Sequence, residues 1–398
     1  MRILSVTPYA PPHIGGLEAL VDSLAVELTR RGHDVTVVTS PAGWEDGFGT
    51  PSRPPSGYRV VYVPAAYRFL QTRMGVPYPL FAPALYRVLA RESANADVVH
   101  AQGFLFHSTV AALSIARRAR NAPPRILTEH VGHVPYSNRV LDRAQALAVA
   151  TIGRWSARAA DAVVVYNRSV EATVAHIAPG SRIEWIDNGV DTSFFHPAQE
   201  AERAQLRHQL GWDEQPRVLF GGRAVAKKGP DVAVEAARIG DGAFVLAVVG
   251  AIAVPDGAPN VERLGLLPRD RMAAALRCAD ALLMPSRGEG LPLTIQEALA
   301  SGLPVVATDD PGYRDKLAGF GSAVRLLPAD GRIMGDALVE MLRDSAASEA
   351  AGRAPELARR RFSVEAFSAR HEELYEELVR LKAGRAVGKS DQEGVVAR

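Results

Sequence analysis

The sequence predicts an α/β fold in which two Rossmann-like domains, each a doubly wound parallel sheet, face a cleft. The chain has 398 residues, which is more than one hydrophobic core usually supports. Short apolar runs alternate with stretches of helical periodicity, as in parallel sheets covered by helices on both faces. A polar segment after residue 196 interrupts this alternation, which then begins again. We therefore expect two consecutive domains, with ligands at the carboxyl ends of their strands.

The first predicted domain covers residues 1–195. Its first strand, 3–7, precedes a loop rich in proline and glycine. Leucines and valines then recur at helical spacing until Gly32 ends the helix. The same alternation continues to the end of the domain. We expect further strands at 35–39, 98–101, 126–128, 162–166 and 183–186, and helices at 107–120 and 138–159.

The second predicted domain covers residues 196–362 and begins with a polar helix, 198–210. We expect strands at 218–220, 245–249, 281–284 and 305–308, and helices at 231–239, 269–279 and 291–301. A closing helix over 363–382 has Ser363 as its N-cap and an apolar stripe that ends at Leu381. Residues 383–398 carry little apolar surface, so we expect a disordered tail.

Bulk composition excludes several classes of protein. The formal net charge of +2 is low for a nucleic-acid-binding protein. Cys278 is the sole cysteine, so no disulfide can form within the chain. No signal peptide is apparent, and the longest apolar run, 243–255, is too short to span a bilayer. We expect a cytoplasmic protein.

A peripheral position on the inner face of the membrane is the alternative. Basic and aromatic residues interleave over 65–91, a composition that suits an anionic membrane carrying a lipid-linked acceptor. We favour the simpler interpretation that this is an irregular segment packed over the first domain.

Gly15 and Gly16 stand where the first helix begins. Glycine allows a ligand to approach the backbone, and the N–H groups at a helix N-terminus attract phosphate. The pair therefore marks a candidate phosphate-binding position. A simple turn explains two adjacent glycines equally well, and no G-x-G-x-x-G fingerprint accompanies them.

A second basic position follows the strand at 218–220. Arg223 comes directly after two glycines, and Lys228 precedes Gly229. The chain has five lysines among its 46 basic residues, and two of them, Lys227 and Lys228, are adjacent here. The use of lysine instead of arginine at these two positions indicates a need for a compact ammonium group. The alternative is a solvated basic loop.

Two glutamates, Glu289 and Glu297, lie in and after the loop that follows the strand at 281–284. Their carboxylates could accept hydrogen bonds from sugar hydroxyls, and the backbone N–H groups of Leu293 and Thr294 could meet a phosphate. Glu297 could equally be a surface residue of its helix. Together with Arg223 and Lys228, however, these residues should approach one edge of the second sheet.

His130 directly follows the strand at 126–128, between Glu129 and the more distant His133. A histidine at that position can bind a substrate or carry a proton, but a structural role fits equally well. No third metal ligand with suitable spacing accompanies the two histidines. The chain also contains no Asp-x-Asp triplet, which is common in metal-dependent nucleotide-sugar enzymes. We therefore expect no metal and no cofactor.

The combined pattern resembles the retaining glycosyltransferases of family four, which have the GT-B fold. The resemblance covers about residues 1–380, and it is most specific over Glu289–Ala298 and 301–306. The matching segments, in chain order, are Pro12–Glu18, Thr128–His130, Asn188–Asp191 with Phe195 and Pro197, Gly222–Gly229, Glu289–Ala298, and Ser301–Val306.

The resemblance implies a role for each candidate residue. Arg223 and Lys228 would hold the donor diphosphate and stabilise its departing charge, and Gly16, beside Gly15, would approach the same phosphates. Glu297 would bind the donor ribose. Glu289 would face the transferred sugar, and His130 would lie near the reaction centre. The closing helix would cross back to the first domain.

The implied activity is transfer of a hexose from a nucleotide-diphosphate sugar to an acceptor, without a metal and with retention of configuration. The donor is thus the expected partner, the acceptor is a glycan, a lipid-linked molecule or a small molecule, and nucleic acid is not expected. Two other functions stay open. A nucleotide-sugar epimerase can share the GT-B architecture, and a non-catalytic subunit could bind the donor without turnover.

Overall fold

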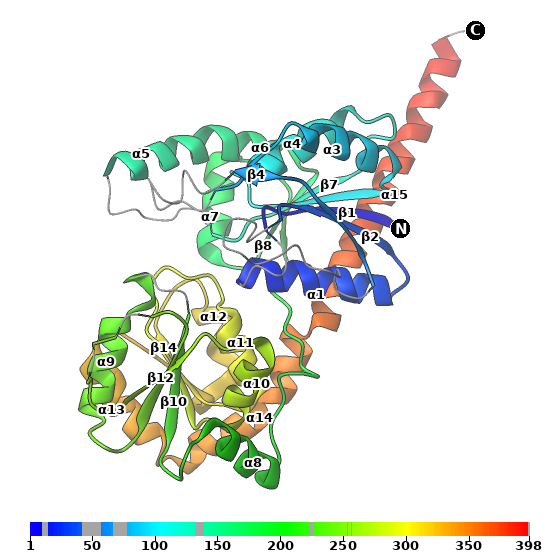
Figure 1. Cartoon of the computed structure of the whole chain (residues 1–398). Helices are drawn as coiled ribbons and strands as arrows, with labels where there is room; N and C mark the ends of the chain where they lie inside the picture. Colours follow the sequence, from blue (N-terminus) through cyan, green and yellow to red (C-terminus); the bar gives the residue numbers. More distant parts are fainter. Residues whose placement is uncertain are drawn as a thin grey trace. The chain divides into compact units, whose positions relative to one another are not determined.

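The computed structural model describes residues 1–9, 15–41, 57–66, 78–131, 139–222, 226–252, 254–255 and 257–396, with the backbone alone for 226 and 385–396. The chain forms two compact units (Figure 1). The first unit contains Met1–Gly189 and Val364–Arg398, and the second contains Val190–Ser363. Each unit is built around its own parallel sheet.

The first unit is a parallel sheet with helices on both faces. Its described strands are ordered β3-β2-β1-β6-β7-β8-β9, and every neighbouring pair is parallel. The strand order reverses beside β1, which makes the β1–β6 edge a topological switch point. The bounds are β1 Arg2–Val6, α1 Gly16–Arg30, β2 Asp34–Thr39, β3 Arg59–Tyr62, β4 Ala65–Ala66, β5 Leu80–Phe81, α3 Ala84–Asn95, β6 Val98–Gln102, α4 His107–Arg118, β7 Arg125–Thr128, α5 Arg139–Ala148, the π-helix η1 Val149–Gly153, α6 Arg154–Ala159, β8 Ala162–Val165, α7 Arg168–Ile177, β9 Ile183–Trp185 and α15 Val364–Val396.

The two faces of this sheet are covered by different helices (Figure 1). On one face, Leu85 and Leu89 of α3 and residues of α4 bury against Leu4 and Val99. The other face carries α1 and α15, whose contact includes an ion pair of 2.9 Å between Arg31 and Glu372. Strands buried on both faces are apolar along their whole length, and for this reason the sequence pattern predicts them well.

The second unit repeats this architecture with a shorter sheet. Its strands are ordered β12-β11-β10-β13-β14-β15, and all neighbouring pairs are parallel. The switch point lies between β10 and β13. The bounds are α8 Glu200–Leu210, β10 Arg217–Gly221, the 3-10 helix η2 Ala226–Lys228, α9 Pro230–Ile239, β11 Val245–Val249, β12 Val261–Gly265, α10 Arg269–Cys278, β13 Ala281–Met284, α11 Leu293–Ala300, β14 Val305–Thr308, α12 Arg314–Leu317, the 3-10 helix η3 Ala318–Ala323, β15 Val324–Leu327, α13 Gly331–Met341 and α14 Ser345–Phe362.

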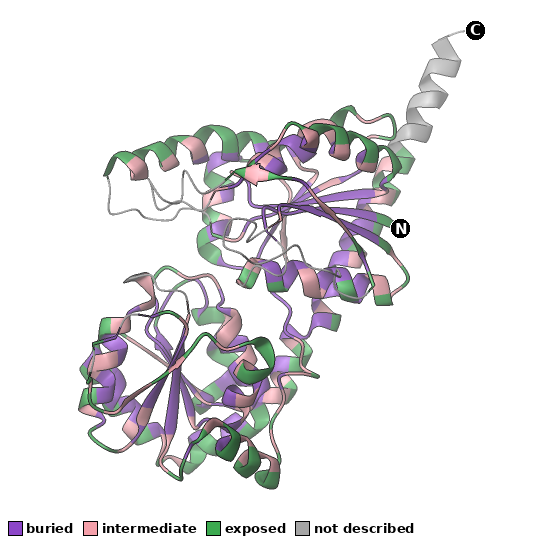
Figure 2. Cartoon of the chain, viewed as in Figure 1, coloured by how far each residue is buried: buried purple, intermediate pink, exposed green. Residues whose placement is uncertain are grey.

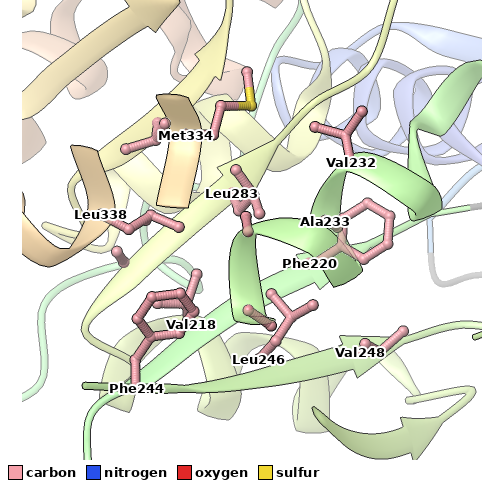
Figure 3. Close-up of a cluster of buried hydrophobic side chains, with 14 of the residues drawn as sticks. Val218, Phe220, Val232, Ala233, Phe244, Leu246, Val248, Leu283, Met334 and Leu338 are labelled. Carbon is pink, nitrogen blue, oxygen red and sulfur yellow. The ribbon is translucent and has the colours of Figure 1, made fainter. Parts of the chain in front are cut away.

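The core of the second unit lies between β10, β11 and β13 on one side and α9 and α13 on the other (Figure 3). Phe220 and Phe244 are fully buried there, together with Leu283, Met334 and Leu338. Each such side chain contributes about 1.5–3 kcal/mol relative to an exposed position. This core fixes the strand ends from which the site loops leave.

The chain enters the second unit at Val190, before the expected boundary at 195. The Val190 N–H donates to the Phe362 carbonyl at 2.6 Å, and the guanidinium of Arg269 lies 4.6 Å from the Phe194 ring centroid. These contacts attach residues 190–195 to the second unit. Residues 190–195 carry no helix or strand pattern, so no local signal marks this earlier crossing.

Three expected elements differ in the structure. The helix expected over 138–159 is α5, the π-helix η1 and α6 in succession. Within 65–91, which we expected to be irregular, residues 67–77 lie outside the described part, while α3 begins at Ala84. The closing helix, which we expected to end at 382, continues as α15 to Val396.

A search of the described residues finds no helix with both the length and the apolar character needed to cross a bilayer. Most helices instead have one buried and one exposed face (Figure 2).

Candidate active site

The loops after β10, β13 and β14 bring together a charged cluster in the second unit. Lys228 Nζ lies 3.1 Å and Lys227 Nζ 3.4 Å from Oε1 of Glu289. Lys228 is the more buried lysine, with 13% of its side chain exposed against 31% for Lys227. Within the described residues, neither ammonium meets this buried oxygen at hydrogen-bonding angles, so both contacts are ion pairs.

Backbone hydrogen bonds hold these loops to one another. The Arg287 N–H donates to the Lys227 carbonyl at 2.9 Å, which ties η2 to the loop that carries Glu289. Asp310 follows β14, and its carboxylate accepts the N–H groups of Gly288 at 2.9 Å and Gly312 at 2.8 Å. A carboxylate that accepts two backbone donors is a rigid clamp. Asp310 therefore fixes the loop on which Glu289 stands.

Two glycines allow the close backbone approaches in this region. Gly229 has a φ of +68°, and a Cβ there would lie 2.7 Å from the Pro285 carbonyl oxygen. Gly250, at the end of β11, has a φ of +108°, and its Cβ would lie 2.4 Å from the Gly222 carbonyl oxygen. Any side chain at either position would push apart the strand ends from which the site loops start.

Gly250→Ala is expected to lower the free energy of unfolding by about 2–3 kcal/mol, the sum of an unfavourable positive φ and an overpacked contact. Gly242→Ala is the matched control, because Gly242 has a φ of +80° but nothing within 4 Å of the added Cβ. That control should lose only about 1 kcal/mol. Chemical denaturation measures the free energy of unfolding of both variants. If the two variants lose the same amount, the close contact with the Gly222 carbonyl adds nothing to the cost of the substitution.

The helix α11 begins at Leu293, after Pro292, and not at 291 as the sequence pattern predicted. Pro292 has an extended backbone and is the N-cap residue, so Leu293 and Thr294 supply the first helical N–H groups. The N–H groups of a first turn have no partner within their own helix, and they suit an anion. Both residues are half-buried.

Glu297 lies one turn into α11 and is also half-buried. Burial raises the pKa of its carboxyl to about 7, against a weaker opposing effect of the positive charge on Arg269. At neutral pH this carboxyl is therefore close to its titration midpoint. A ligand that donates hydrogen bonds to it would favour the ionised form. The alternative of a solvated surface glutamate does not fit this environment.

Arg223, the other cation expected at this edge, lies outside the described residues. His133 also lies outside them.

The glycines of the first candidate position belong to the first unit: Gly15 is the N-cap of α1, and Gly16 is its first residue. A Cβ on Gly15 would lie 2.2 Å from Oε2 of the buried Glu18, so a side chain there would require the Glu18 carboxylate to move.

The first unit has its own polar cluster at the carboxyl ends of β6 and β7, next to the switch point. His130 is half-buried, and its Nε2 lies 2.9 Å from Oε1 of Gln102. Gln102 in turn donates through Nε2 to Nε2 of His100 at 3.2 Å. The Tyr166 hydroxyl donates to the His130 carbonyl at 2.6 Å. The histidine is thus held at both its ring and its backbone.

The hydrogen-bonded chain continues into α15. His100 Nδ1 lies 2.7 Å from the Tyr375 hydroxyl, and its Nε2 lies 2.7 Å from the Thr128 hydroxyl. The His371 ring stacks on His100 with centroids 5.4 Å apart. A small cavity opens over these groups. It is lined by Leu20, Val21, Leu24, His100, Gln102, Thr128, His130, Val164, Tyr166, Ile186, Asn188, Phe367 and His371.

The histidines of this cluster are neutral at physiological pH. Burial, helped by the nearby His371, lowers the pKa of His130 to about 4. Burial also lowers the pKa of His371 to about 4 and holds that of His100 well below its usual value. Because Gln102 accepts from His130, the His130 proton lies on Nε2 and Nδ1 is left as an acceptor.

Glu129, beside His130, has a structural role. Its carboxylate accepts the Phe104 N–H at 2.7 Å and the Val131 N–H at 3.1 Å, which joins the turns that follow β6 and β7. The side chain is buried.

Sequence reasoning missed several residues of both clusters. Asp310 was detectable in principle, because it stands directly after a predicted strand in an Asp-Asp-Pro-Gly turn. His100 and Gln102 also lie at a predicted strand end. His371 and Tyr375 gave no such signal, since only the packing of α15 on the first unit brings them to His100.

The fold of two parallel α/β units is shared with solved structures. Sucrose-phosphate synthase from Thermosynechococcus elongatus superposes with a TM-score of 0.74 at 20% identity, covering 96% of this chain and 99% of that one. Anabaena HepE in complex with UDP gives 0.73 at 17% identity, with 95% and 100% covered. The fold is therefore GT-B, and this is the architecture of a glycosyltransferase.

Sequence comparison identifies the family. Residues 14–194 match the model of Glycosyltransferase Family 4, and residues 215–344 match that of Glycosyl transferases group 1. The GDP-mannose-dependent alpha-(1-6)-phosphatidylinositol monomannoside mannosyltransferase of Mycobacterium tuberculosis is 30% identical over 387 residues, covering 88% of this chain and 92% of that protein. The D-inositol 3-phosphate glycosyltransferase of Xylanimonas cellulosilytica is 26% identical, with 93% and 94% covered. The chain belongs to glycosyltransferase family four, and it is an enzyme of that class.

Proposed function

We propose that this enzyme transfers a hexose from a nucleotide-diphosphate sugar to an acceptor hydroxyl, with retention of configuration and without a metal ion. The observation that carries the proposal is the half-buried ammonium of Lys228, which lies 3.1 Å from Glu289, a residue of the loop that leads into α11. A fixed cation and helix N–H groups at the carboxyl end of a parallel sheet suit a pyrophosphate.

Catalysis by this cluster would come from stabilising the leaving group. As the bond between the anomeric carbon and the phosphate oxygen breaks, its electron pair stays on the diphosphate. Lys228, together with Arg223 and the N–H groups of Leu293 and Thr294, would offset that growing charge. Gly15 and Gly16 would supply further N–H groups from α1. Lys228 and the N–H groups that begin α11 are held by the loops of the second unit, so these groups need little reorganisation during the reaction.

The remaining candidates would position the sugar and the nucleoside. Glu289, held by the Asp310 clamp and paired with Lys228, would accept hydrogen bonds from the transferred sugar. Glu297 would accept the ribose hydroxyls. The acceptor oxygen would attack the anomeric carbon from the face that the diphosphate leaves, and its proton would pass to a departing phosphate oxygen. Neutral His130 would bind near the reacting sugar through Nδ1.

Metal independence rests on the available ligands. Within the described residues, no three His, Cys, Asp or Glu side chains form a group that could hold a metal ion, and Asp-x-Asp is absent from the sequence. Excess chelator should leave turnover unchanged. Loss of activity in chelator that is restored by Mg²⁺ or Mn²⁺ would contradict this part of the proposal.

The names of the relatives suggest which substrates to try first. The Mycobacterium tuberculosis relative is named as GDP-mannose-dependent, and the names of that protein and of the Xylanimonas relative both contain inositol. A thermal-shift screen of GDP-mannose and UDP-glucose identifies the donor, because a ligand that binds only the native state raises the melting temperature. Mass spectrometry with an inositol-phosphate or phosphatidylinositol-type acceptor then detects transfer, and NMR of the product gives the anomeric configuration.

The outcomes of this experiment separate the proposed function from its rivals. A donor-dependent product with the donor's own anomeric configuration supports the proposal. Conversion of the donor without any acceptor would indicate an epimerase instead. Tight donor binding without turnover on any acceptor would indicate a binding subunit.

Donor binding should become about tenfold tighter between pH 6 and pH 8, if Glu297 must be ionised to accept ribose hydroxyls. The free carboxyl has a pKa of about 7, so rising pH removes the proton that competes with the ligand. A nucleotide sugar is the right probe, because its pyrophosphate diester does not titrate in this range. Calorimetry at several pH values measures the effect. Glu297→Gln should flatten it, and binding that weakens with rising pH would contradict the role of the carboxylate.

A further inference from the structure

Apolar side chains of the α5–η1–α6 segment, residues 139–159, lie exposed on the first unit. Val140 is 77% and Leu147 65% exposed, and Ile152 and Trp155 are exposed at 42% and 37%. The described α5 has no buried residue, and Figure 2 shows it in the colours of exposed and intermediate residues. Exposed apolar residues grouped on one element mark an interaction surface more often than scattered ones do.

The opposite side of the segment anchors it to the first unit. Val149 and Ala157 join the core cluster that contains Phe104, and the Ser156 hydroxyl donates to the Phe104 carbonyl at 2.8 Å. The positions of Val140, Leu147 and Trp155 recur at helical spacing, so they share the side that faces away from this anchor. The anchor lies in η1 and α6, and α5 belongs to the same helical run.

The charge on this face selects its partner. Arg139, Arg143, Arg154 and Arg158 are exposed, whereas the one acidic residue within 139–159, Asp142, is half-buried. A second copy of this chain, paired by two-fold symmetry, would set arginines against arginines. An anionic lipid surface would instead accept the guanidinium groups at its head groups and the apolar side chains below them.

We propose that the exposed face of residues 139–158 docks on an anionic membrane, with the segment parallel to the surface and Trp155 at the level of the head groups. This docking face is not the segment 65–91, whose basic and aromatic composition suggested a membrane contact. In the described part of that segment, Phe81 is buried and the Tyr78 hydroxyl donates to the Leu105 carbonyl at 2.6 Å. The membrane site does not depend on which sugar the enzyme transfers.

Co-sedimentation of the full chain with vesicles tests this site. We expect binding to vesicles of equal phosphatidylcholine and phosphatidylglycerol, weakened by salt, and little binding to phosphatidylcholine alone. Leu147→Glu should weaken binding about tenfold or more, as expected when an apolar contact is lost. Arg143→Glu combined with Arg154→Glu should remove the preference for anionic lipid. Melting temperatures verify that each variant folds.

Leu266→Glu is the matched control, since Leu266 is 72% exposed on the second unit and carries no part of this face. It should bind vesicles as the wild type does. Equal binding of Leu147→Glu and wild type, or no binding of wild type to anionic vesicles, would overturn the proposal. So would a dimer in sedimentation velocity that Leu147→Glu dissociates, because the face would then belong to a second copy.

Discussion

Lys228→Met is expected to lower kcat by about 10²–10³-fold, the usual effect of removing one preorganised group that stabilises a developing negative charge. Methionine keeps much of the side-chain volume, so the packing against Gly222 should survive, while the ammonium that lies 3.1 Å from Glu289 is lost. Steady-state kinetics at saturating donor isolates this effect from weaker binding. The loss should appear in kcat, because the charge on the diphosphate grows only as the bond breaks.

Two further variants make this result specific. Lys382→Met removes a lysine of the first unit whose Nζ lies 3.8 Å from Asp161, and it should keep wild-type kcat. Lys227→Met should cost less than Lys228→Met, since Lys227 is more exposed and lies farther from the carboxylate. Near-normal turnover of a folded Lys228→Met enzyme would contradict the proposed role of the ammonium.

Gln102→Leu is expected to lower kcat about 10–100-fold, as the loss of a partner that orients a functional side chain commonly does. Gln102 accepts from His130 and donates to His100, so leucine would remove the group that fixes which His130 nitrogen carries the proton. Gln102 would act as a positioning residue. Gln205→Leu, an exposed position on α8, is the matched control and should retain wild-type kinetics.

The pH profile distinguishes positioning from simple destabilisation. In Gln102→Glu a carboxylate would face His130, which should raise the His130 pKa from about 4 toward or above its ordinary value. If neutral His130 is required, activity would be present above that pKa and lost as pH falls through it. The acid limb of kcat should therefore move toward neutral pH in this variant. An unchanged acid limb would show that His130 does not need to be neutral.

The class of fold was predictable because its signal is local. Strands such as β8 and β13 are buried on both faces and are apolar throughout, and many of the helices carry a regular apolar stripe. The weaker strands β12 and β15 were missed, since none of their residues is fully buried and charged residues interrupt their apolar runs. Helices α13 and α14 were missed because alanine and glycine dilute their stripes.

The candidate site was predictable where residues lie close to a strand end in the chain. Lys228 and Glu289 were both placed at the same sheet edge by this argument, and the structure brings them together. Predicting that Asp310 clamps these loops would have required knowing where the Gly288 and Gly312 N–H groups point. Turn geometry of that kind depends on the packing of three loops at once.

The sequence by itself determined two parallel α/β units and the family, and it placed Lys228 and Glu289 at one sheet edge, because each of these depends on residues that are near one another in the chain. The tertiary structure alone decided the chain of hydrogen bonds from Tyr375 through His100 and Gln102 to His130. Tyr375 is 275 positions from His100, and no local pattern reports a contact across that separation. Packing of α15 on the first sheet creates it, and burial there makes the histidines neutral.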